Sequence, residues 1–208
     1  MAFSGWPEEA LEFFDGLAAE NTKAYWTAHK PVYEKYVLRP MAELVEDLAP
    51  EFGPGKIFRP YRDVRFSKDK SPYQTHIAAA AGGGYIRLSA DGLAAGAGMY
   101  DMRPGQLDAY RRAVAADHPG RDLERVIAEI GRHGIGVSAR SELKTAPRGY
   151  PADHPRIGLL RYKSIIAWQQ WPVEPWLETP AARDRVAGFL RATRPLAGWL
   201  AANVGAAE

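Results

Sequence analysis

The sequence predicts an α+β fold, in which a central antiparallel or mixed sheet with hairpins is flanked by N-terminal and C-terminal helices. Apolar side chains recur at helical spacing near both ends of the chain, whereas its middle alternates and turns sharply. The 208 residues are 46% hydrophobic and 11% aromatic, which suits a sizeable core. We therefore expect a single domain over residues 1–208. It would consist of a helical segment (1–50), a sheet-rich middle (56–102) and a mixed C-terminal half (103–208).

The N-terminal helices are predicted from apolar stripes and proline positions. Residues 8–20 place apolar side chains on one helical face, and a proline with two glutamates favours a helix start there. The next helix contains Pro31, which should end or kink it. Apolar positions then repeat at helical spacing over residues 33–48, where Pro40 predicts a further kink.

The middle of the chain has a two-residue period. Residues 56–66 alternate like a strand, residues 67–72 predict a turn or loop, and residues 73–83 fit a second strand. Residues 85–100 predict two short strands around an Asp-Gly turn. The small residues 94–98 leave room for close approach by another backbone, a side chain or a ligand.

The C-terminal half mixes helices with extended segments. Residues 103–117 and 120–134 predict two helices, and residues 135–155 are mostly extended or looped. Residues 156–171 predict a short helix followed by a strand. Residues 179–204 predict a closing helix that is kinked by its internal proline.

Positive charge is concentrated in one stretch of the middle region. The chain has a net charge of +2, yet residues 56–76 carry six lysines and arginines against two aspartates. The segment therefore has a net charge of +4, and the rest of the chain is slightly acidic. This distribution favours a confined positive site over a general nucleic-acid coat.

Strand alternation would sort the residues of this segment onto two faces. One face would carry Arg59, Tyr61, Asp63 and Arg65. The other would carry Phe58, Pro60, Arg62, Val64 and Phe66. Asp63 can hold an arginine on either side, whereas Arg62 lies among apolar neighbours and needs a carboxylate, carbonyls or an anionic ligand.

These residues predict an anion-binding site. Arginine forks and lysine charges suit phosphate or carboxylate, and the proposed contacts are Arg59, Arg62, Arg65, Lys68, Lys70 and Arg148. Arg148 would form a second wall of this site; otherwise it belongs to a rigid loop and pairs with an acid. The catalytic candidates are Asp63, which would orient the arginines, and Tyr73 or His76, which would transfer a proton. Surrounding cations should lower the pKa of Asp63 and keep His76 neutral, as a general base requires.

Two alternatives stay open. The segment could belong to a non-enzymatic module that binds nucleic acid or a protein, or its charges could form a purely structural ion-pair network. The absence of cysteine excludes disulfides and thiolate metal sites. No histidine spacing indicates a metal, and no phosphate-binding or dinucleotide-binding loop or esterase elbow is found, so we expect no metal and no cofactor. Without a leader or a long apolar run, we expect a cytoplasmic protein with no membrane segment.

The string FRPYRDVRFSKDKSPYQTH resembles the signature of the family called domain of unknown function 2461, a family of conserved hypothetical proteins. NTKAYWTAHKPVYEKYVLRPMAEL and the stretches around the central hairpin and LLRYKSI are similar to other parts of that family. The resemblance implies a shared functional surface but no established activity. Pro60 departs from the apolar residue usual in the family, and this proline indicates an edge position or an irregular strand start.

Overall fold

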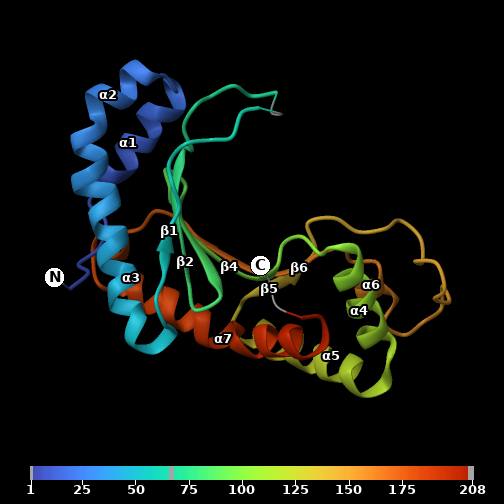
Figure 1. Cartoon of the computed structure of the whole chain (residues 1–208). Coiled ribbons are helices and arrows are strands. Elements are labelled where there is room, and N and C mark those ends of the chain that lie inside the picture. The colour runs from blue at the N-terminus through green and yellow to red at the C-terminus, as the bar shows by residue number, and fades with distance from the viewer. Residues whose placement is uncertain (1, 66–67, 206–208) are drawn as a thin grey trace. The chain divides into compact units, whose positions relative to one another are not determined.

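The computed structural model describes residues 2–65 and 68–205 and confirms the α+β class (Figure 1). Its sheet has six strands in the order β1-β2-β3-β4-β6-β5. The strands are β1 (Lys56–Ile57), β2 (His76–Ala81), β3 (Gly84–Ser89), β4 (Gly92–Met99), β5 (Gly136–Ser138) and β6 (Ile165–Trp171). The pairs β1–β2, β2–β3 and β5–β6 are antiparallel.

Helices precede, interrupt and follow these strands. They are α1 (Glu8–Ala19), α2 (Lys23–Val32), the π-helix η1 (Tyr33–Leu38), α3 (Arg39–Phe52), α4 (Pro104–Ala115), α5 (Asp117–Arg132), α6 (Ile157–Leu160), the 3₁₀-helix η2 (Pro175–Glu178) and α7 (Ala181–Asn203). No helix in the described part of the chain is long and apolar enough to cross a bilayer.

The helical run from α2 to α3 continues through two prolines, of which the sequence predicts that Pro31 ends or kinks its helix and that Pro40 kinks the next. Pro31 lies inside α2, and Pro40 lies in the first turn of α3. Between them the chain widens into η1, where the N–H of Arg39 reaches back to the carbonyl of Glu34. A π-turn relieves the clash between a proline ring and the preceding turn, and it tolerates the missing donor. The helix therefore absorbs Pro40 by widening.

The described chain divides into two compact units. The first contains residues up to 95 together with 170–188, and the second contains residues 96–169 together with 189 onwards. In the first unit, α3 lies beside β1 and β2, and α1 packs against α2 (Figure 1). One face of β2 and β3 is buried in the core of this unit through Ile77, Ala79, Ile86 and Leu88.

The small residues of β4 accommodate β6. A Cβ at Gly98 (φ +124°) would overlap the carbonyl oxygen of Ile165, and one at Gly92 (φ +107°) would overlap that of Trp171. Because the early end of β4 meets the late end of β6, these two strands are antiparallel. The indole of Trp168 lies against Gly96. The space predicted around residues 94–98 is thus filled by the backbone and a side chain of β6.

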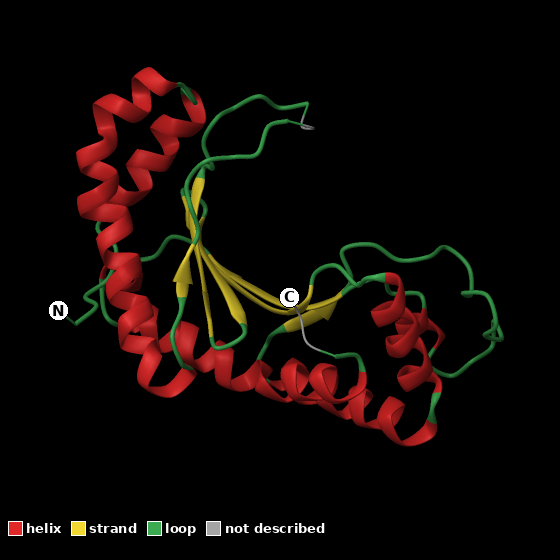
Figure 2. Ribbon diagram, viewed as in Figure 1, coloured by secondary structure: helices red, strands yellow, loops and turns green. Residues whose placement is uncertain are grey.

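The predicted strand over residues 56–66 is mostly absent. It ends after Ile57, and the described residues of segment 58–75, which we call the basic arm, form a loop between β1 and β2 (green in Figure 2). Pro60 has no N–H to donate to a neighbouring strand, which favours an irregular backbone. Phe66 falls outside the described residues, so its predicted place on the arm is not described.

Candidate functional site

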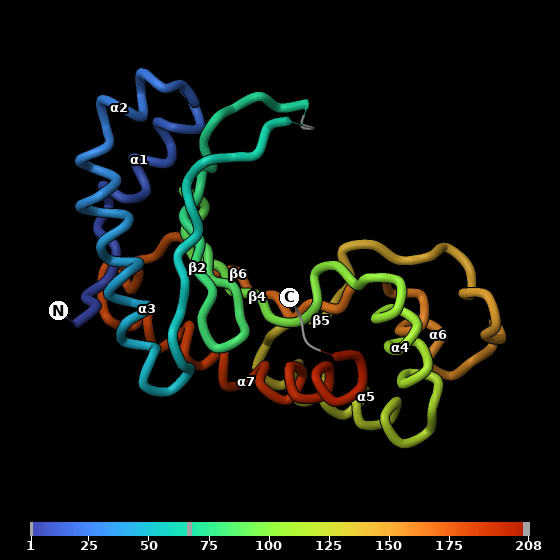
Figure 3. Tube along the Cα trace, in the orientation of Figure 1, coloured from blue at the N-terminus to red at the C-terminus, as the bar shows by residue number. Residues whose placement is uncertain are grey.

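Backbone hydrogen bonds join the two halves of the basic arm, which run side by side in Figure 3. The N–H of Arg62 donates to the carbonyl of Pro72 at 2.9 Å, and the N–H of Gln74 donates to the carbonyl of Pro60 at 2.7 Å. These two bonds give the base of the arm a hairpin-like pairing. The half of the arm that follows β1 is therefore held in place by the half that leads into β2.

Tyr73 fastens the returning half of the arm to the N-terminal helices. Its ring is 6% exposed and stacks on Trp26, with ring centroids 4.4 Å apart and planes 5° from parallel. Its backbone N–H and carbonyl each bond the Asn21 side chain at 3.0 Å. Burial, and to a lesser extent the neighbouring Tyr61, raises the pKa of Tyr73. This position suits a packing anchor, and the proton-transfer role of Tyr73 stays a prediction.

Asp63 binds one of the two arginines that the sequence places beside it. Arg65 donates to both carboxylate oxygens, from Nε at 2.9 Å and from Nη2 at 2.6 Å. The Arg65 N–H adds a bond of 3.2 Å. The hydrogen bonds from Arg65, followed by the charge of Arg59, lower the pKa of Asp63. The carboxylate is therefore ionised at neutral pH and orients Arg65.

Asp69 supplies the partner that Arg62 requires. The Nη1 atom of Arg62 binds one carboxylate oxygen, and the N–H of Ser71 donates to the other at 2.9 Å. Hydrogen bonds from Ser71, and then the one from Arg62, lower the pKa of Asp69 to about 2. Across the same arm, Lys70 Nζ donates to the carbonyl of Val64 at 2.9 Å. Arg62 and Lys70 thus help to close the arm on itself.

His76 begins β2 at the base of the arm, close to two arginines. Burial lowers its pKa, and the positive charges of Arg87 and Arg62 lower it further. Its Nε2 atom lies 3.4 Å from the hydroxyl of Tyr85 on the neighbouring strand. His76 is therefore neutral at physiological pH, which is the protonation state that a general base needs.

The contacts of the arm follow the alternation in its sequence even though it is not a strand. Tyr61 lies on the helical side, with its ring 5.5 Å from that of Tyr73. Phe58 lies on the sheet side, with its ring 6.1 Å from that of Tyr85. Tyr61 and Phe58 thus lie on different sides of the arm, and the charge of Arg62 lowers the pKa of His76 at its base.

A family model described as conserved hypothetical protein (DUF2461) matches residues 9–199. The chain belongs to this family. The match covers most of the chain and confirms the resemblance seen in the sequence. Neither the curated proteins nor the solved structures gave a match. The DUF2461 description names no activity.

Two exposed arm cations of this DUF2461 protein form neither an ion pair nor a hydrogen bond with the described residues. Arg59 and Lys68 form no ion pair with any described residue, although the charge of Arg59 acts on Asp63. Arg148 is exposed in the loop between β5 and α6, which belongs to the second unit. It likewise pairs with no acid in the described chain, and its place in the site stays a prediction.

Two residues beside His76 were missing from the prediction. Tyr85 and Arg87 lie on β3, and the register pairs Arg87 with Ala78, two residues after His76. Alternation along GYIRLS places both side chains on the same face of the strand. The two-glycine turn before β3 is a recognisable hairpin signal that would have aligned them with His76.

A buried arginine of the second unit has a structural role. Arg156 is 7% exposed and caps the end of α4. Its guanidinium donates to the carbonyls of Val114 at 2.6 Å and of Ala115 and Ala116 at 3.2 Å. Glu124 lies 3.6 Å away and balances its charge. These bonds satisfy carbonyls that a helix end otherwise leaves free.

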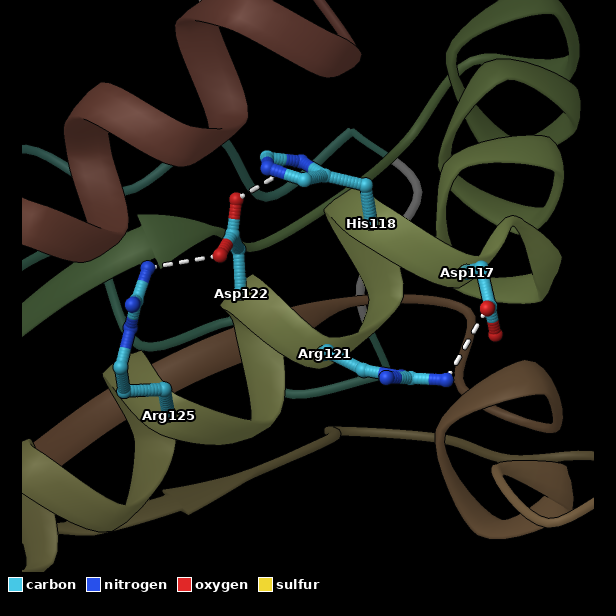
Figure 4. A pocket seen from close by; sticks show the side chains of 5 residues that line it. All are labelled: Asp117, His118, Arg121, Asp122 and Arg125. Carbon is cyan, nitrogen blue, oxygen red and sulfur yellow. Dashed lines mark hydrogen bonds and ion pairs between the residues drawn. The ribbon is translucent and has the colours of Figure 1, made fainter.

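A shallow hollow on α5 is lined by charges that neutralise one another (Figure 4). Asp122 accepts from Arg125 at 2.6 Å and lies 3.2 Å from the His118 ring, and Arg121 pairs with Asp117 at 2.9 Å. All five lining residues belong to one helix surface. Among the described residues, no group of three histidine or acidic side chains could hold a metal ion.

Proposed function

We propose that this protein binds a small anionic molecule, one bearing a phosphate or a carboxylate, at the basic arm and at its base near His76. The observation that supports this proposal is the excess of cations after the arm's aspartates have been paired. Asp63 holds Arg65, and Asp69 holds Arg62. Arg59 and Lys68 are left exposed without a carboxylate among the described residues.

The side chains match the chemistry of such an anion. An arginine fork binds two oxygens at once, whereas a lysine supplies a mobile point charge. Arg62 and Arg87 also place positive charge around His76. If the bound molecule carries an acidic proton, neutral His76 is the group that could accept it. Binding is the core of the proposal, and a reaction at His76 would be an addition to it.

The experiment uses variants that leave the arm's own bonds intact. Inorganic phosphate and succinate would be titrated against the whole protein by calorimetry and thermal denaturation. We expect at least one anion to raise the melting temperature, and the variant Arg59→Ala with Lys68→Ala to bind it about tenfold or more weakly. Arg121→Ala is the matched control, because it removes an exposed arginine of α5. If no phosphate or carboxylate stabilises the wild-type protein, the proposal fails.

A second candidate function is suggested by an exposed aromatic ring on the arm. Tyr61 is 53% exposed and belongs to the same cationic arm as Arg59 and Arg65, so its ring could stack on a nucleic-acid base or contact a protein. Binding to nucleic acid would weaken steeply as salt rises, because phosphate contacts release counterions. Salt-insensitive binding of an oligonucleotide, or none, would count against this form of the alternative.

The purely structural alternative makes a different prediction. In its strong form it requires buried ion pairs, whose disruption would unfold the protein. The pairs Arg62–Asp69 and Asp63–Arg65 are at the surface, so we expect Asp63→Ala to leave the fold intact. Loss of cooperative unfolding in that variant would instead favour a structural network.

A further inference from the structure

Aromatic and cationic side chains share one face of the sheet at the base of the arm. The register aligns Ala80 with Tyr85, and Ala78 with Arg87. Phe58 continues β1 past its end, because its N–H donates to the carbonyl of Ala78 at 2.9 Å. The small side chains of Ala78 and Ala80 on β2 therefore lie between Phe58 on one side and Tyr85 and Arg87 on the other.

The ring of Phe58 is unusually accessible for its size. It is 41% exposed, and it lies 6.1 Å from the Tyr85 ring with the two planes 33° apart. Part of the Phe58 side chain is therefore open to contact by a planar molecule. Stacking of this kind is tolerant of ring identity, since every aromatic ring presents a π-face.

Cationic groups adjoin this platform. The Tyr85 hydroxyl lies 3.4 Å from His76 Nε2, so the platform leads directly to the histidine. Arg87 lies on the same face of β3 as Tyr85, opposite Ala78, which follows His76 by two residues on β2. One face of the first unit thus offers an aromatic surface at one end and positive charge with a neutral hydrogen-bonding ring at the other.

We propose that the anion bound here is the phosphate of a free mononucleotide, with the base stacked on Phe58 and the phosphate directed toward Arg87 and His76. This inference rests on the proposed function and names the class of ligand. A stacked base and a phosphate dianion together match both ends of the platform, whereas a phosphate alone leaves Phe58 unused. A free nucleotide fits better than a nucleic acid, because the excess charge is confined to residues 56–76 in a chain of net charge +2.

The experiment separates the ring from the phosphate. Adenosine monophosphate, ribose 5-phosphate and inorganic phosphate would be titrated by calorimetry against the whole protein. We expect adenosine monophosphate to bind about tenfold or more tightly than ribose 5-phosphate. Phe58→Leu keeps an apolar side chain against Tyr85 but removes the π-face, and it should abolish most of this difference. Tyr100→Ala, which removes another exposed ring, is the matched control.

Each outcome decides a specific point. If all three phosphates bind with similar affinity, the mononucleotide inference is overturned while the proposed anion site stands. If none binds, both fail. If a single-stranded oligonucleotide binds far more tightly than the mononucleotide, the ligand is a nucleic acid and the inference is again overturned. An unchanged preference in a folded Phe58→Leu variant would exclude stacking at this ring.

Discussion

Replacing Tyr73 tests whether this side chain anchors the basic arm or transfers a proton. Tyr73→Ala removes a ring that is 6% exposed and stacks on Trp26 at 4.4 Å. Deleting a buried aromatic ring lowers the free energy of unfolding by roughly 3–5 kcal/mol, which includes the loss of the stacked pair. The bonds to Asn21 come from the backbone of Tyr73 and can persist. We therefore expect a loss of about 3–4 kcal/mol.

The companion variant Tyr73→Phe keeps the ring and removes the hydroxyl. That hydroxyl forms no hydrogen bond with the described residues, so the free energy of unfolding should change by less than about 1 kcal/mol. The free energy of unfolding of both variants is measured by chemical denaturation, with tryptophan fluorescence as the signal. Phosphate titration measures the affinity of the site for an anion. If Tyr73→Phe is as damaging to stability as Tyr73→Ala, the anchoring argument is refuted. If Tyr73→Phe leaves the stability unchanged but removes a catalysed reaction, the proton-transfer role of Tyr73 is the correct one.

Three further predictions concern buried and titrating groups. Arg156→Ala should lower the free energy of unfolding by about 2–4 kcal/mol, because buried carbonyls lose their donor, and Arg156→Lys should lose less in the same denaturation assay. Hydrogen bonds from Ser71 and Arg62 lower the pKa of Asp69 to about 2, so its stabilisation is complete above about pH 4 and is lost as the pH falls toward 2. The Asp69→Asn variant should not lose this part of its stability between about pH 4 and pH 2, and an acid-unfolding profile equal to that of the wild type would contradict the prediction. Burial and nearby arginines lower the pKa of His76, so its contribution to stability is complete above the unfolded pKa of 6.5 and declines as the pH falls below it. An NMR titration that places the ring pKa above 6.5 would refute this.

Local sequence signals predict correctly those helices and turns whose conformation depends mainly on their own residues. The Asp-Gly turn between β3 and β4 and the apolar stripe of α1 have this character, and both elements form as predicted. Pro31 did not end its helix, because the helix continues into a π-turn that the sequence does not reveal. Alternation over residues 56–66 indicated a strand, yet a strand also needs a partner with free donors and acceptors, and beyond Ile57 the pairing is sparse.

The sequence identifies the charged side chains of the candidate site but not how they pair. Alternation indicated that Arg62 needs an acidic or carbonyl partner, and Asp69 meets that need. The choice between Asp63 and Asp69 depends on how the arm folds back, which alternation cannot specify. Tyr85 and Arg87 became part of the site through the β2–β3 register, a non-local feature set by the turn between these strands.

Some cations of the basic arm take no part in the contacts that hold the arm together. Tyr73 fastens the arm to the helices, and Arg62 and Lys70 close it on itself. Neither Arg59 nor Lys68 contributes to this closure through a described ion pair, and both add to the local positive charge. Like charges gathered in one segment repel and so destabilise it unless an opposite charge is bound. An anion would remove that repulsion, and its binding should therefore stabilise the arm as well as fill the site.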